Sequence, residues 1–266
     1  MTTHTITARA LSLVALCGLA LAAGPGHAAS LQVAPVSLTL TPRQNADGLW
    51  LSNNGDAPLQ AQVRIYRWTQ AEGEDRLEPT RDLTLSPPML QVGAGERQLV
   101  RVIRLGPPPD TVEASYRVIV DELPVPVAPD TPPRPGLDFV LRYSLPIFLR
   151  PLSDADRAEP ATPATPLTGS LVEVGNQTQF QLENRGTGHV QIAELVFVDP
   201  AGKRFVIRQG LAGYVLPGAT KRWPVSAPGG VDALRRGHFK ARINGAMEES
   251  ALLPPPSTLP QADGPR

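Results

Sequence analysis

The segment at residues 137–151, LDFVLRYSLPIFLRP, constrains the fold of this chain more than any other part of it. Its first half alternates between large apolar side chains and more polar ones, and only Val140 breaks the polar side. Successive side chains of an extended strand point to opposite faces, so this alternation predicts a β-strand with a row of large apolar side chains on one face. Such a row can be buried in its own domain, or it can be offered to another protein as a missing strand. The members of the row are Leu137, Phe139, Leu141 and Tyr143.

The first 28 residues have the layout of a secretory signal peptide. Arg9 precedes an apolar run at residues 10–23, and small residues follow the run. The run is too short to be a membrane span and has no stop-transfer flank. The sequence therefore predicts export, with cleavage after Ala28 or Ala29.

Composition narrows the class of protein further. The only cysteine, Cys17, lies inside the predicted signal peptide, so we expect a mature chain without disulfides, thiol nucleophiles or thiolate metal sites. The chain contains 30 prolines and 23 glycines, which together with many short Val, Leu and Ile runs favour short strands and turns over helices. Its formal net charge is zero, so no strong field is available to attract nucleic acid or an anionic membrane.

Predicted strands follow one another at intervals of roughly ten residues in the first half of the mature chain, as in an immunoglobulin-like sandwich. A connection at residues 124–135 holds six prolines in twelve residues, which prevents it from pairing in a sheet. The strands predicted for this half lie at residues 31–40, 49–53, 60–68, 83–85, 90–92, 98–105, 115–123 and 137–149.

A second β domain is predicted after a linker rich in Pro, Ala, Asp and Thr. Its predicted strands lie at residues 170–174, 177–184, 191–198, 204–208, 219–225 and 237–243. The expected organisation is a signal peptide at 1–28, a first domain at 29–149, a linker at 150–166, a second domain at 167–253 and a disordered Pro-rich tail at 254–266.

Five segments in this order and spacing resemble the periplasmic chaperones of the chaperone–usher pilus pathway. They are SLQVAPVSLTL, LWLSNNGDAP, SPPMLQVGAGERQLVRVIR, EASYRVIVDELP and LRYSLPIFLRP. The most specific pair is VDELP before a Pro-rich loop and the LRP exit after it. The resemblance covers residues 29–245.

The resemblance implies an all-β fold of two immunoglobulin-like sandwiches in a boomerang arrangement. It also implies that the chain holds pilus subunits in the periplasm by donor-strand complementation and delivers them to an outer-membrane usher. The row that begins at Leu137 would then fill the groove of a subunit that lacks its last strand. Each large side chain so buried contributes on the order of 1.5–3 kcal/mol. An exposed row of this kind also favours a self-capping dimer.

The family further has an ionic triad between its domains, and Glu113, Arg150 and Asp232 match its members by position. Asp232 is assigned through its spacing to Asn244 and Gly245. A desolvated triad in a cleft would help to set the angle between the domains, whereas the alternative is three unrelated surface charges.

One departure concerns the anchor for the subunit's terminal carboxylate. The best-known branch of the family uses an Arg and a Lys, but Pro35 and Pro146 stand at the matching positions. This places the chain nearer the branch termed archaic. A carboxylate still favours a cationic partner, and the candidates are Arg117 first, Arg142 second and Arg101 third.

No catalytic constellation is recognisable, so the chain is not expected to be an enzyme or to need a cofactor or metal. His189 and His238 lack HExxH spacing, and no serine stands in a GxSxG context. Two alternatives remain open, a structural pilus subunit and a carbohydrate-binding β-sandwich protein. The absence of cysteine from the mature chain argues against the first, and the low aromatic content of 5% argues against the second.

Overall fold

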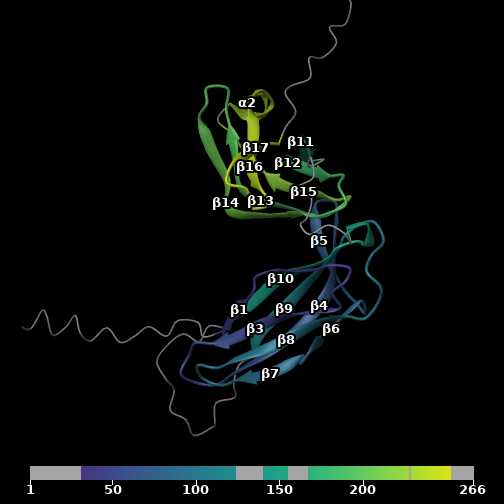
Figure 1. Cartoon of the computed structure of the whole chain (residues 1–266). Helices are drawn as coiled ribbons and strands as arrows, with labels where there is room; N and C mark the ends of the chain where they lie inside the picture. The colour runs from purple at the N-terminus through teal and green to yellow at the C-terminus, as the bar shows by residue number, and fades with distance from the viewer. Residues whose placement is uncertain (1–30, 124–139, 155–166, 228, 253–266) are drawn as a thin grey trace, which may run out of the picture.

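The computed structural model describes residues 31–123, 140–154, 167–227 and 229–252. Within these ranges the chain is nearly all-β and forms two sandwiches joined at an angle (Figure 1). The predicted signal peptide, the Pro-rich connection, Leu137, Phe139, most of the predicted linker and the tail lie outside the described residues.

The first sandwich has two sheets. One has the strand order β1-β3-β8-β6, formed by β1 (Leu31–Ala34), β3 (Ala46–Asn53), β8 (Arg97–Arg104) and β6 (Leu83–Ser86). The other has the order β2-β10-β9-β4-β5, with β7 also paired to β4; its strands are β2 (Leu38–Leu40), β10 (Arg142–Leu149), β9 (Ala114–Leu123), β4 (Leu59–Ala71), β5 (Glu74–Pro79) and β7 (Met89–Val92).

Alternation along the strands builds the core between these sheets. Leu49 and Leu51 are fully buried, while Trp50 between them is 39% exposed on the outer face. On β9, Tyr116, Val118 and Val120 point into the same core. This is the period-2 pattern that burying one face of a sheet requires.

The second sandwich is smaller and has an aromatic core. Its sheets have the orders β11-β12-β15 and β14-β13-β16-β17. Phe180 and Phe239 stack with ring centroids 4.0 Å apart and planes 2° apart, and Trp223 is buried beside them. The elements are β11 (Leu167–Val174), β12 (Gln177–Asn184), β13 (Val190–Val198), β14 (Arg204–Val215), β15 (Thr220–Pro224), α2 (Gly230–Arg236), β16 (His238–Ile243) and β17 (Glu249–Ala251).

The strand expectations needed several corrections. The stretch predicted as one kinked strand at 31–40 is split into β1 and β2, which belong to different sheets, with residues 35–37 between them. β5, β17 and α2 were not predicted; β5 has all six of its side chains exposed and so gives no hydrophobic period to detect. Directly after β10 the chain forms a short 3-10 turn, η1 (Leu152–Asp154).

Candidate functional site

The first candidate feature is an unpaired stretch along one side of β10. This strand pairs with β9 along its whole length, from Arg142 to Leu149. On the other side only its last three residues pair, in parallel, with β2. Within the part of the chain that the structure describes, residues 142–146 therefore have no strand partner on that side. A free strand edge presents backbone donors and acceptors on which another strand can assemble.

At this edge, the described part of the predicted apolar row lies at the open side of the sandwich, where β10 faces β1 of the opposite sheet. Leu141 and Tyr143 are half-buried and pack against the first core, and Leu145 continues their side of the strand into full burial. The Tyr143 hydroxyl donates to the Leu31 carbonyl oxygen at 2.6 Å and so connects β10 to β1, the edge strand of the opposite sheet. Leu141 and Tyr143 thus contact the core of their own domain and remain partly exposed to solvent.

The opposite face of the same stretch carries an ionic cluster. The Asp121 carboxylate accepts from Arg64 Nη2 at 2.5 Å and from Arg142 Nε. Burial opposes ionisation of Asp121, but the hydrogen bonds from both guanidinium groups outweigh burial and lower the pKa of this carboxyl. A hollow of about 420 Å³ lies over the cluster, between the first residues of β10 and β4 and the end of β9. Arg142 is thus already paired with a carboxylate of its own chain.

Arg117 has a different environment. It lies directly across from Pro146 on β10 and from Tyr66 on β4, on the outer face of the sheet. Its guanidinium carbon is 3.7 Å from the ring centroid of Trp68, and Nη1 reaches the Ser144 carbonyl oxygen only at 3.4 Å. Burial lowers the pKa of Arg117, yet an arginine keeps its charge. The Asp75 carboxylate of β5 attracts this charge from a distance but forms its ion pair with Lys221, so no carboxylate of the described residues is paired with Arg117 itself, and the half-buried cation retains capacity for an anion.

Arg101, the third candidate, is not brought near this site. It lies on β8 in the other sheet, across from Gly48 and Ser86. There it lines a separate hollow of about 310 Å³ together with Trp50. Of the two prolines at the family's anchor positions, Pro35 is exposed after β1, and Pro146 is buried in β10.

The ionic triad is not assembled as the sequence predicted. Asp232 is exposed in the first turn of α2, and Figure 1 shows α2 at the end of the second sandwich away from the first. Arg150 is buried directly after β10, at the first sandwich. Counting residues back from Asn244 could not reveal that a helix carries Asp232 to the far end of its domain. Glu113 lies at the contact between the sandwiches, and its partner there is not Asp232.

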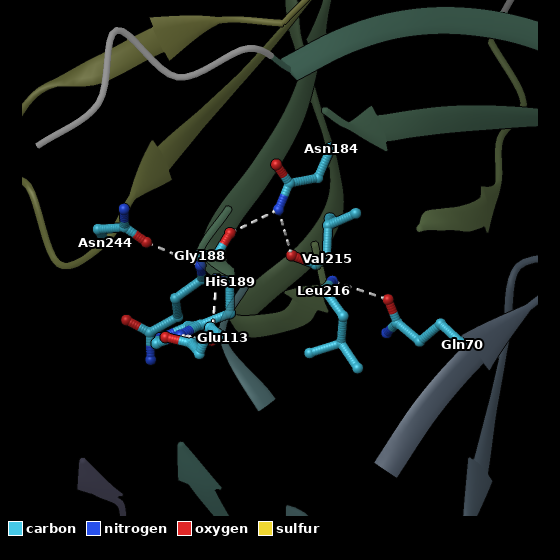
Figure 2. A network of polar contacts seen from close by, with 9 residues as sticks. Gln70, Glu113, Asn184, Gly188, His189, Val215, Leu216 and Asn244 are labelled. Carbon is cyan, nitrogen blue, oxygen red and sulfur yellow. Dashed lines mark hydrogen bonds and ion pairs between the residues drawn. The ribbon is translucent and has the colours of Figure 1, made fainter. Parts of the chain in front are cut away.

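That partner is His189, as Figure 2 shows. One carboxylate oxygen of Glu113 accepts the backbone N–H of His189 at 3.0 Å and lies 2.8 Å from Nδ1 of the imidazole. The backbone N–H of Glu113 donates to the Thr187 carbonyl oxygen at 2.8 Å. Asn184 holds this loop by donating from Nδ2 to the carbonyl oxygens of Gly188 and Val215.

An aromatic cluster completes the contact between the sandwiches. Trp68 and Phe148 from the first sandwich bury their rings against Tyr214 from the second, with centroid distances of 5.8 Å to Tyr214 from each. Gln70 of the first sandwich also bonds to the second: its Nε2 donates to the Tyr214 carbonyl oxygen at 2.8 Å. Its Oε1 accepts from the Leu216 N–H at 2.9 Å, as Figure 2 shows.

Sequence reasoning missed this cluster, although two signals were present. Trp68 stands one position out of phase with Val63 and Ile65, so it points away from the core of its own domain. The run LPIFL in β10 is apolar on both faces, which is typical of a strand covered on both sides.

Two kinds of feature are absent from the residues that the structure describes. No group of three or more His, Cys, Asp or Glu side chains is arranged to hold a metal ion there. None of the helices in those ranges has the length and apolarity to cross a membrane.

Comparison with known proteins identifies the family. Residues 30–153 match the family model described as pili and flagellar-assembly chaperone, PapD N-terminal domain. This part of the chain therefore belongs to the pilus-assembly chaperones, and the resemblance drawn from the sequence is confirmed. The family is one of chaperones and not a class of enzymes. No protein of curated function matches the chain in sequence.

Solved structures share the fold of both sandwiches. A chain of the pre-assembly complex between the chaperone CsuC and the tip adhesion subunit CsuE, from the archaic Csu pili of Acinetobacter baumannii, is 22% identical with a TM-score of 0.65, over 85% of this chain and 98% of that chain. A chain of the complex between the SafA pilin and the SafB chaperone of Salmonella enterica is 20% identical with a TM-score of 0.57, over 82% and 91%. The E. coli chaperone DraB is 16% identical with a TM-score of 0.56, over 84% and 96%.

Proposed function

We propose that this protein is a periplasmic chaperone of the archaic branch that binds pilus subunits by donor-strand complementation and passes them to an outer-membrane usher. The observation that carries the proposal is the unpaired side of β10 at residues 142–146. An apolar row lies beside it, at the open side of the first sandwich. A subunit that lacks a strand exposes an apolar groove and unpaired backbone edges. Pairing with β10 would satisfy one of those edges, while Leu141 and Tyr143 and the preceding Leu137 and Phe139 would enter the groove.

Arg117 is the proposed anchor for the subunit's C-terminal carboxylate. It lies across from Pro146, where the family's best-known branch has its basic residue, and it has no ion-pair partner among the described residues. Arg142 is the weaker candidate because Asp121 already takes its Nε–H. Arg101 is set aside because it lies on the other sheet.

Family membership and the sequence layout support the remaining parts of this proposal. Pilus chaperones work in the periplasm, and the first 28 residues have the layout that directs export there. The chaperone–subunit complexes among the structurally similar proteins support subunits as partners.

The test is co-export with the small secreted proteins encoded beside this chain. Each is produced with and without the tagged chaperone, and its soluble periplasmic yield is measured. We expect one or more to become soluble and to co-purify. The Leu141→Glu variant should lose this capture, because a carboxylate would enter an apolar groove. Leu211→Glu is the matched control, since Leu211 is 55% exposed on β14 of the second sandwich. Undiminished capture by Leu141→Glu would contradict the donor-strand role.

A further inference from the structure

Arg117 is held by aromatic rings from both sandwiches. Trp68 of β4 lies under its guanidinium at 3.7 Å, and the ring of Tyr214 from β14 lies 5.6 Å from the same carbon. Cation–π contacts attract a guanidinium without neutralising its charge. Two rings from different sandwiches therefore fix the place of one cation, and within the described ranges the nearby acidic group, Asp75, is paired with Lys221 and not with Arg117.

The position of Tyr214 is itself set by the domain interface. The residue is buried, and Gln70 of the first sandwich bonds to its carbonyl oxygen. Gln191 donates from Nε2 to the Tyr214 hydroxyl at 3.2 Å, and the ring packs edge-on against Trp68. Tyr214 can therefore support Arg117 only when the second sandwich is seated on the first.

We propose that Tyr214 is a positioning residue for Arg117, so that the carboxylate anchor is built by both sandwiches together. This inference rests on the proposed function and adds to it the part played by the second domain. Trp68 covers one face of the guanidinium and the Tyr214 ring lies beside it, which leaves the in-plane N–H groups for a carboxylate that can accept two of them. Nη1 approaches Ser144, a residue of the free stretch of β10, so the anchored carboxylate would lie beside the docked subunit strand.

A purely structural role makes a different prediction. If Arg117 only joins the sandwiches, removing the Tyr214 ring weakens their contact but does not alter recognition of a carboxylate. The two roles are separated by a readout that depends on the carboxylate itself. The probe is the subunit recovered by co-export, prepared with its natural C-terminal carboxylate and with a C-terminal amide.

Binding of both forms is titrated against four chaperones: wild type, Tyr214→Leu, Tyr214→Phe and Arg117→Ala. Amidation should weaken binding to the wild type about tenfold, the scale of one charge-assisted hydrogen bond. The same change should have little effect on Tyr214→Leu and Arg117→Ala, because the anchor is already lost. Tyr214→Phe keeps the ring and should behave as wild type. Full carboxylate dependence in Tyr214→Leu would overturn the inference.

A second measurement needs no subunit. Modification by phenylglyoxal, an arginine-selective reagent, is followed at Arg117 by peptide mass spectrometry. Arg117 should react about tenfold faster in Tyr214→Leu than in the wild type, as expected for loss of a desolvated cation–π contact. Trp50→Leu is the control, because Trp50 makes the same kind of contact with Arg97 on the other sheet. Equal rates at Arg117 in wild type and Tyr214→Leu would contradict the inference.

The outcomes also separate this inference from the proposed function. If Tyr214→Leu is too unstable to measure, Gln70→Ala replaces it, since it removes the hydrogen bond that positions the Tyr214 backbone without deleting any aromatic side chain. Capture by the wild type with unchanged carboxylate dependence in these variants would remove only the role of Tyr214. If the wild type captures no neighbouring secreted protein, the proposed function fails and this inference with it.

Discussion

The imidazole of His189 lies flat on the ring of Phe148, with ring centroids 3.5 Å apart and planes 6° apart. Phe148 belongs to β10, the strand with the free edge, whereas His189 precedes β13 of the second sandwich. The Nδ1 atom of the same imidazole lies 2.8 Å from a carboxylate oxygen of Glu113. The proposed subunit-binding strand and the second sandwich are thus in direct contact.

Replacing His189 with Leu should destabilise the interface. The substitution keeps apolar bulk against Phe148 but leaves the Glu113 carboxylate, whose side chain is 7% exposed, without the imidazole. We expect a loss of about 1–3 kcal/mol in the free energy of unfolding, measured in urea. The control is His238→Leu, on β16 of the same sandwich. Equal stability of the two variants would contradict a structural role for the Glu113–His189 pair.

Replacing Arg117 with Ala should weaken subunit binding by about 1.5–3 kcal/mol, or roughly one to two orders of magnitude in Kd, because a charge-assisted contact to the carboxylate is lost. Lys240→Ala, on β16 of the second sandwich, should leave Kd unchanged. Isothermal titration with the co-exported subunit measures both. An Arg117→Ala chaperone that binds as tightly as Lys240→Ala would remove Arg117 as the anchor.

The Asp121 cluster should make stability depend on acid pH. The folded pKa of Asp121 is lowered below its ordinary value of 3.8. Its contribution is therefore fully present above the unfolded pKa and is lost as the pH falls through the lower folded pKa. The gap in unfolding free energy between wild type and Asp121→Asn should be largest near neutral pH and shrink below about pH 4. Urea unfolding across this pH range measures it, and a gap that grows on acidification would show that another group dominates.

The free protein should also self-associate through β10, because an unpaired edge beside an apolar row favours a second copy of the same surface. Sedimentation velocity of the purified chaperone over a concentration series should show a dimer. Leu141→Glu should shift the distribution to monomer, whereas Leu211→Glu should not. A wild type that stays monomeric at every concentration would limit the role of this edge to subunits.

Local pattern predicted much of the first sandwich. Alternation predicted the strands at residues 60–68 and 137–149, and Val63 and Leu145 on them are buried in the core, but the phase of Trp68, which indicates a second covered face, was not recognised. β5 was missed because its side chains are all exposed, so its sequence has no alternation of apolar and polar residues to indicate a strand.

The residue order by itself determined that the chain would form strands, which face of each strand would be apolar, and that residues 30–153 belong to the pilus-assembly chaperones. These properties follow from side-chain alternation and from motifs within single segments. Tertiary structure alone decided that Glu113 would meet His189 and not Asp232, and that Tyr214 would lie beside Arg117. Such partners lie in different sandwiches, and their contact depends on how two finished domains pack, which no periodicity within one strand encodes.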